Sequence, residues 1–160
     1  MRRITVFIMV IIILVAINFQ IYQKEQLLTE GSTILLELAP ADPRSLMQGD
    51  YMILRYKVAA LAEATGAEKD GFLVMGLDEN KVARFIRIYN DKNLQAVEFL
   101  LRFRKRGRGI NLGAESFFFQ EGHARFYDKA RYGELKVAAN GDSVLIGLRD
   151  ENLKSLQADK

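Results

Sequence analysis

The sequence predicts a mostly β protein: an N-terminal transmembrane helix followed by a small antiparallel β-barrel or sandwich domain with one or two short helices. Three observations predict this fold class. An uncharged, strongly apolar run begins at Ile4 and continues, with a few polar residues, to Tyr22. Seven or eight short strand-like runs follow, and the gaps between them are mostly too short for the crossovers of a parallel sheet. The 160 residues contain no cysteine, so disulfides do not hold the fold.

The N-terminal run has the length and composition of a membrane span. No charge occurs between Arg3 and Lys24. At about 1.5 Å per residue, the helix from Ile4 to Ile21 is about 27 Å long, which matches the hydrocarbon core of a bilayer. A buried helix of a soluble protein seldom lacks a polar face for four turns. Residues 1–22 are therefore predicted to be a transmembrane signal-anchor, with an aromatic ring at the far interface.

The flanking charges predict the orientation of this anchor. Arg2 and Arg3 precede the apolar run and favour a cytoplasmic N-terminus, which leaves the chain from about residue 23 outside. For a bacterium this means a single-pass protein of the inner membrane with a periplasmic C-terminal domain. A cleaved, soluble periplasmic binding protein is the alternative. Against it, residues 18–22 are bulky and lack the small residues of a signal-peptide cleavage site.

The first half of the remaining chain begins with a short polar stalk, residues 23–31, which continues the helix and ends at a glycine. Residues 33–38 are predicted to be a strand. Residues 39–48 contain both prolines and predict an ordered loop. Residues 51–58 form the next predicted strand, and the alanine-rich residues 59–65 predict one or two helical turns.

The second half is predicted to be a series of hairpins. Residues 71–75 and 81–89 flank a turn of Asp, Glu and Asn. Residues 97–104 alternate so that Val97, Phe99, Leu101 and Phe103 share one face of a strand. The same kinds of signal predict a strand at 115–119, a short helix at 121–130 with Phe126 on its inner face, and a hairpin of residues 134–138 and 143–148 around Asn140-Gly141. The β domain thus covers residues 32–150, and residues 151–160 form a polar tail.

Composition limits the possible functions. The formal charge is +3, but without Arg2 and Arg3 there are 21 basic and 20 acidic residues, a net charge of +1. The basic character is therefore mostly a signal of topology, and nucleic acid is not an expected partner. His123 is the only histidine and cysteine is absent, so we expect no metal site and no cofactor.

One segment carries a family resemblance. Residues 49–56 read G-D-Y-x-x-L-x-Y, which resembles the pattern of the GDYXXLXY family of bacterial membrane-anchored proteins. Residues 113–122 and 130–137 resemble the second and third blocks of that family. The resemblance implies one N-terminal span, an extracytoplasmic domain and a polytopic membrane protein as partner, without supplying a reaction. The motif residues that it singles out are Asp42, Pro43, Arg44, Gly49, Asp50, Tyr51, Leu54 and Tyr56.

The motif also has a local physical interpretation. Gly49 can adopt a positive φ at the entry to the strand. Asp50 can accept backbone N–H bonds and so cap the loop, with Arg44 close enough in sequence to pair with it. The following strand is expected to be buried on both faces at its start. We interpret the motif as a folding nucleus, and the alternative is a groove beside the loop that takes a peptide or partner strand.

The segment 44–54 also resembles a signal-peptidase box, which raises a hydrolase alternative. Aligning the Gly-Asp pair places the nucleophile at Ala41, which has no hydroxyl, and Ser45 lies four residues away. Serine–lysine hydrolysis also needs a desolvated lysine. Lys57 and Lys69 lie downstream, but neither is in a clearly apolar run. We therefore expect no enzymatic activity, and a catalytically silent relative of that fold is the more credible form of the resemblance.

A basic cluster and an aromatic run are candidate contact sites. Five positive charges fall within seven residues, in a domain tethered close to a bilayer. The alternatives for this cluster are a solvated strand end, a contact with anionic lipid headgroups, and a contact with an acidic patch of a partner protein. Phe118 is expected to face away from its aromatic neighbours and to be a partner contact if nothing covers it. The candidate contact residues are Arg102, Arg104, Lys105, Arg106, Arg108 and Phe118.

The motif interpretation predicts the effect of replacing Asp50. Asp50→Ala should lower the free energy of unfolding by about 1–2 kcal/mol, because backbone N–H groups of the loop lose their acceptor. The measurement is chemical denaturation of the full-length protein in detergent. An unchanged unfolding midpoint combined with lost partner binding would assign Asp50 to recognition instead of folding.

Overall fold

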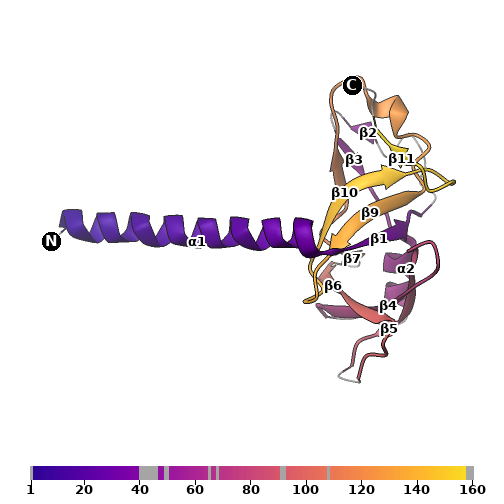
Figure 1. Cartoon of the computed structure of the whole chain (residues 1–160), viewed down its shortest axis with the longest axis horizontal. Helices are drawn as coiled ribbons and strands as arrows, with labels where there is room; N and C mark the ends of the chain where they lie inside the picture. Colours follow the sequence, from indigo (N-terminus) through magenta and orange to yellow (C-terminus); the bar gives the residue numbers. More distant parts are fainter. Residues whose placement is uncertain are drawn as a thin grey trace.

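The computed structural model consists of a long helix and a β domain at its C-terminal end (Figure 1). The predicted fold class is confirmed: the domain is mostly antiparallel β structure, arranged as half-barrels. The structure describes residues 2–39, 47–48, 51–64, 66–67, 69–90, 93–107 and 109–157.

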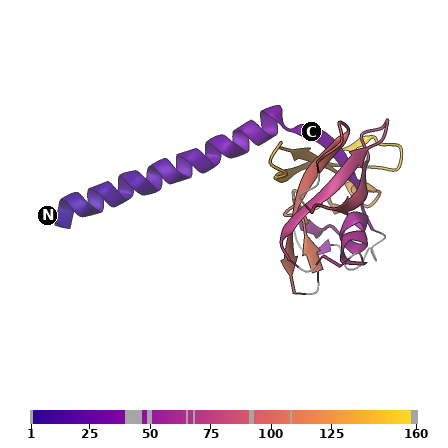
Figure 2. The same cartoon turned by 90° about the horizontal axis from the view of Figure 1, so that it is seen from below.

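Helix α1, Arg2–Glu30, extends away from the domain, and the domain does not fold back over most of its length (Figures 1 and 2). Its apolar side chains are exposed from Ile4 to Tyr22. Within the described residues it is the one helix long and apolar enough to cross a membrane, judged by length and composition. It therefore points to a membrane anchor or a signal sequence.

Within the described residues, the domain contains three antiparallel sheets. The first has the order β1-β9-β10-β11, with bounds Ser32–Glu37, Tyr132–Val137, Ser143–Arg149 and Ser155–Leu156. The second has the order β2-β3-β8, with bounds Met47–Gln48, Tyr51–Ile53 and Ser116–Phe118. The third has the order β5-β4-β6-β7, with bounds Ala83–Ile88, Gly71–Leu77, Glu98–Arg106 and Gly109–Asn111.

One hydrophobic core joins the sheets to the short helix α2, Lys57–Ala64. Main-chain hydrogen bonds also connect the sheets: Leu35 N donates to Lys81 O at 2.9 Å and Arg102 N donates to Gly141 O at 2.8 Å. Burial of this apolar surface is the main favourable term for such a domain. The largest side chains removed from solvent are Ile34, Leu36, Leu73, Met75, Leu101, Leu135 and Leu148.

The predicted strand at residues 51–58 is shorter in the structure. Strand β3 ends at Ile53, and α2 begins at Lys57 because the segment 57–64 is rich in good helix formers. The expectation of burial on both faces was wrong. Met52 is buried while Ile53 is 43% exposed, so β3 has one solvent face.

The predicted helix at residues 121–130 is wrong in extent. The structure has only a 3₁₀ turn, η2, at Ala124–Phe126. Phe126 is 47% exposed, and Tyr127 is the aromatic residue that enters the core. The ring of Tyr127 lies 4.9 Å from that of Phe117 and 5.6 Å from that of Phe119. These contacts form between segments and hold the chain in an irregular path that helix propensity alone does not indicate.

The junction between α1 and the domain is closely packed. Gly31 N donates to Leu27 O at 3.1 Å, and Lys136 Nζ donates to Gly31 O at 2.9 Å. A Cβ at Gly31 would lie 2.3 Å from Leu27 O, so a larger residue would force the backbone to move. Leu27 itself is buried. The helix therefore ends at the predicted glycine. It is attached to β9 there, nine residues after the apolar run ends at Tyr22.

Two partly buried ion pairs connect strands of the same sheet: one joins the neighbouring β10 and β9, and the other joins β5 to β6 across the intervening β4. Arg149 donates to the Glu134 carboxylate through Nε at 2.9 Å and Nη2 at 2.7 Å, across β10 and β9. Arg87 donates to the Glu98 carboxylate at 2.8 and 3.1 Å. The Glu98 side chain is 4% exposed. Its bond to Arg87, aided by the Gln95 N–H, holds the pKa of the Glu98 carboxyl below its usual range.

The lowered pKa of Glu98 predicts acid-dependent stability. Because the folded pKa is depressed, the ion pair contributes fully above the unfolded carboxyl pKa of about 4.3 and is lost as pH falls through the lower folded value. Glu98→Gln should therefore destabilise the protein at pH 7, and its difference from wild type should shrink as the pH falls below about 4. Urea denaturation of the full-length protein at several pH values measures this difference.

The control is Glu121→Gln, which removes an exposed carboxylate. It should leave the free energy of unfolding almost unchanged at each pH. A difference between Glu98→Gln and wild type that stays constant with pH would contradict the role of this ion pair.

Candidate functional site

The last tyrosine of the family motif lies at the centre of the domain. Tyr56 is 3% exposed, and its hydroxyl donates to Ala114 O at 2.6 Å. Burial, aided by the nearby Glu115 carboxylate, raises the pKa of the Tyr56 phenol well above its usual value, so the group stays protonated and remains a donor. The main chain beside it is also paired, since Leu54 N donates to Glu115 O at 2.7 Å.

Gly133 also packs closely against the Tyr56 side chain. A Cβ at Gly133 would lie 2.9 Å from Tyr56 Cε1 and 3.0 Å from Tyr56 Oη. Gly133 lies on β9, the strand between β1 and β10, and is paired with Leu36 of β1 and Leu148 of β10. Glycine is required here because the aromatic ring lies directly against the strand backbone. The three sequence blocks around residues 49–56, 113–122 and 130–137 thus meet at one tyrosine.

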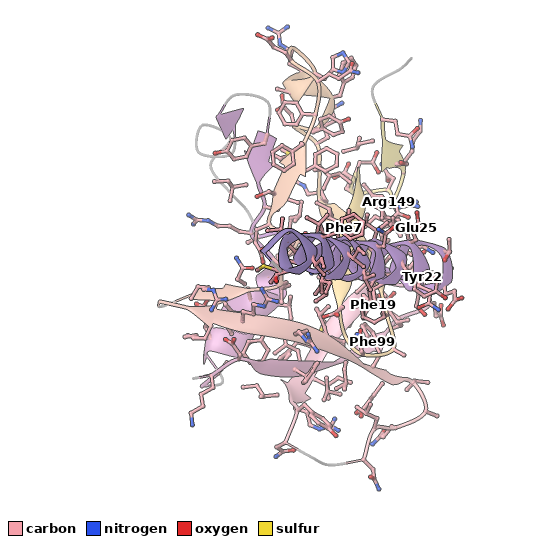
Figure 3. The ribbon with its side chains drawn as sticks, turned by 90° about the vertical axis from the view of Figure 1, so that its left-hand side faces the viewer. Phe7, Phe19, Tyr22, Glu25, Phe99 and Arg149 are labelled. Atoms are coloured by element: carbon pink, nitrogen blue, oxygen red, sulfur yellow. The ribbon has the colours of Figure 1, made fainter. Side chains whose placement is uncertain are left out.

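A second feature is a basic cavity where α1 joins the domain. Three cationic side chains from two distant segments line it: Lys24 from α1 and Arg102 and Arg104 from β6. Its volume is about 190 Å³, and Asp142 and Ser143 close one side. Figure 3 views the domain from the N-terminal end of α1, so the face in view is the one that the helix enters.

An apolar groove runs beside the same end of α1. It starts at Glu30 and Ser32, has a volume of about 580 Å³ and passes between β1 and the start of β6. Phe99 of this groove and Arg149 lie on opposite sides of the helix axis in Figure 3. The apolar side chains that line it are Ile34, Leu77, Leu94, Val97, Phe99 and Val137. Val97 was predicted to share the core face of this strand, but β6 begins only at Glu98 and the Val97 side chain is 73% exposed.

The sequence model of a family described as GDYXXLXY protein matches residues 13–148. The chain belongs to the GDYXXLXY protein family. No curated protein and no solved structure matches it. The match extends from the second half of α1 to the end of β10, and therefore includes the Tyr56 contact, the basic cavity and the apolar groove.

Part of the GDYXXLXY motif lies outside the described residues, namely Asp42, Pro43, Arg44, Gly49 and Asp50. The motif residues that the structure describes divide into two groups. Leu54 and Tyr56 are buried in the core. Tyr51 is half-buried, and its ring lies 5.7 Å from that of Phe118, which is opposite it on β8 and 74% exposed. Because its side chain is exposed, Phe118 stays a candidate for contact with a partner.

The structure separates the basic cluster of the GDYXXLXY chain. Arg102 and Arg104 enter the basic cavity, whereas Lys105 and Arg106 do not line it. Lys105 N instead donates to Asp70 Oδ1 at 2.6 Å, and the Arg106 guanidinium donates to Lys105 O at 3.3 Å. Arg108 lies outside the described residues. The alternation of side chains along β6 explains why the even-numbered Arg102 and Arg104 share a face.

Lys24 was missed as a site residue. Its signal in the sequence is its place as the first charge after the apolar run, but nothing in the sequence shows that β6 lies beside it. The hairpin tip at residues 138–142 was also missed. Ala138, Ala139 and Asp142 line a hollow together with Gln23 and Lys24, so the tip reaches back along α1 to the end of the apolar run.

The residues of the hydrolase alternative are only partly described. Ala41 and Ser45 lie outside the described residues. Lys57 donates to the Glu37 carboxylate, and both side chains are almost half exposed, at 45% and 46%. His123 is half-buried and packs edge-on to Phe126 with ring centroids 5.4 Å apart. Among the described residues no three His, Cys, Asp or Glu side chains are grouped as metal ligands.

The Tyr56 contact predicts a measurable loss of stability. Tyr56→Phe removes the hydrogen bond to Ala114 O inside the core and should lower the free energy of unfolding by about 1–2 kcal/mol. The matched control is Tyr51→Phe in the same motif, whose ring is half-buried and which should change stability by less than about 0.5 kcal/mol. Equal losses in the two variants would contradict the central role of the Tyr56 hydroxyl.

Proposed function

We propose that this GDYXXLXY protein is a non-catalytic, single-pass membrane protein whose β domain lies outside the bacterial inner membrane and assembles with a polytopic membrane protein. The observation that carries the proposal is that an exposed apolar helix and an apolar groove occur at the same end of the domain, the groove beginning at the last residue of α1. Both lie on the face of the domain where α1 enters, so one partner can contact both.

The helix supports an uncleaved anchor. Its side chains from Ile4 to Tyr22 have no cover from the domain, and lipid or another helix would remove them from water. Leu27, Gly31 and Lys136 attach the last turns of α1 to β9. Cleavage near residue 23 would separate these packed turns from the apolar run. The junction would then no longer connect the apolar run to the β domain.

The groove supports a partner that is itself in the membrane. Its exposed residues Leu77, Leu94 and Val97 lie on the same side of the domain as the end of α1. A soluble partner would cover the groove alone, whereas a polytopic protein can pack a span against α1 and a loop against the groove. Phe118 is a further contact candidate, on the separate β2-β3-β8 sheet.

The absence of catalysis is part of the proposal and rests on two observations. Ala41 occupies the place of the nucleophile in the signal-peptidase alignment. Lys57 is paired with Glu37 at the surface, whereas a lysine base for serine hydrolysis needs a desolvated amine.

Site-specific photocrosslinking in native membranes tests the partner. A photoreactive residue at Phe7 in α1 and another at Val97 in the groove should capture the same multi-span membrane protein, because the partner is proposed to contact both surfaces. The matched control is Phe126, which is exposed on η2 and should not capture it.

Other outcomes contradict the proposal. Capture of different proteins at Phe7 and Val97 would show that no common partner covers helix and groove. A mature protein that begins near residue 23 by mass spectrometry would exclude the anchor. A C-terminal topology reporter active only in the cytoplasm would exclude the orientation.

A further inference from the structure

The basic cavity combines residues that the sequence keeps far apart. Lys24 is in α1, and Arg102 and Arg104 are in β6, yet all three line one cavity of about 190 Å³. At about 30 Å³ per water, this volume corresponds to about six waters, enough for a phosphate group with part of its hydration. The cavity therefore has the size and the charge of a small anion site.

The charges in the cavity are only partly neutralised. Arg102 Nη1 lies 3.0 Å from Asp142 Oδ1, and the Arg102 guanidinium is also 5.3 Å from the centre of the Phe72 ring. These contacts hold Arg102 in place. Lys24 and Arg104 have no ion pair within the part of the chain that the structure describes. With three cations and one carboxylate, the cavity keeps a net positive charge.

The position of the cavity along α1 indicates its ligand. Lys24 is the first charged residue after the apolar run and comes two residues after Tyr22. An aromatic residue at this place belongs to the headgroup level of a bilayer. The hairpin tip at 138–142 lines a hollow with Gln23 and Lys24, so this side of the domain reaches the same level. The cavity is then level with lipid phosphates.

We propose that Lys24, Arg102 and Arg104 bind the phosphate of an anionic phospholipid in the leaflet on the side of the domain. The proposal rests on the orientation given under the proposed function. Lys24 Nζ and the two guanidinium groups donate to phosphate oxygens, which are the acceptors these cations prefer. Asp142 holds Arg102 and disfavours headgroups that present a second acidic group at that side.

A lipid bound at this site would also affect the orientation of the domain. Because α1 is attached to β9 through Gly31 and Lys136, a lipid held between α1 and β6 fixes the tilt of the whole domain relative to the bilayer. The apolar groove beside Glu30 would then face the membrane plane at a constant height. Lipid binding and partner binding are thus expected to support each other.

Native mass spectrometry of the full-length protein in detergent tests the proposal, with phosphatidylglycerol and phosphatidylcholine as probes. The wild type should bind phosphatidylglycerol more tightly than phosphatidylcholine. Each basic residue near an anionic surface contributes a factor of about five in affinity. The double variant Lys24→Gln/Arg104→Gln should therefore weaken phosphatidylglycerol binding at least about fivefold, and phosphatidylcholine binding by a smaller factor because choline offsets the phosphate charge.

The matched control is Arg125→Gln/Lys129→Gln, which removes two exposed charges near η2 and should leave phosphatidylglycerol binding unchanged. Equal losses in the two double variants would overturn the site, because they would show an effect of total charge. Equal binding of the two lipids by the wild type would overturn it as well. Competition by inorganic phosphate at millimolar concentration would assign the cavity to free phosphate instead of lipid.

Two further measurements keep the outcomes distinct. Circular dichroism shows whether the double variant folds. If it does not, Lys24→Arg/Arg104→Lys keeps the charge and should keep lipid selectivity, and loss of selectivity in that folded variant would count against the site. A wild-type protein that stays anchored and crosslinks its partner but binds the two lipids equally would refute the lipid site alone. A cleaved anchor would refute the proposed function and this placement together.

Discussion

The contact between the Tyr56 hydroxyl and the Ala114 carbonyl is the constraint on which the rest of the domain depends. Tyr56 lies between α2 and β3, Ala114 precedes β8, and Gly133 of β9 receives the tyrosine ring against its backbone. Each of the three segments comes from a different sheet or connection. Both residues are buried, so water does not replace this hydrogen bond. Without it, the Tyr56 hydroxyl and the Ala114 carbonyl would both lack a partner.

The junction at Gly31 connects the β domain to the long apolar helix. Leu27 is buried against the domain, and Lys136 binds the carbonyl that ends the helix. These contacts attach the end of the helix to the first sheet. This attachment brings Lys24 of α1 beside β6 and the hairpin tip beside the end of the apolar run. The two surfaces of functional interest, the basic cavity and the apolar groove, both depend on it.

Local patterns predicted much of the fold and failed where contacts between segments decide. The alternation of Phe99, Leu101 and Phe103 correctly indicated the core face of β6, since a strand side chain has only two directions. The segment 121–130 was expected to be helical, yet it forms only a 3₁₀ turn, and the ring of Tyr127 packs against those of Phe117 and Phe119. Similarly, Ile53 was expected inside and lies at the surface, because β3 pairs with two very short strands.

The sequence by itself determined the long apolar helix, the antiparallel β class and the family, because hydrophobic periodicity and a contiguous motif are local properties of the chain. Only the tertiary structure decided that Tyr56 meets Ala114 and Gly133, that Lys24 lies beside Arg102 and Arg104, and that the main-chain N–H of Lys105 binds the Asp70 carboxylate. These partners are separated by tens of residues. Their proximity follows from the packing of three sheets around one core, and no short stretch of sequence contains that information.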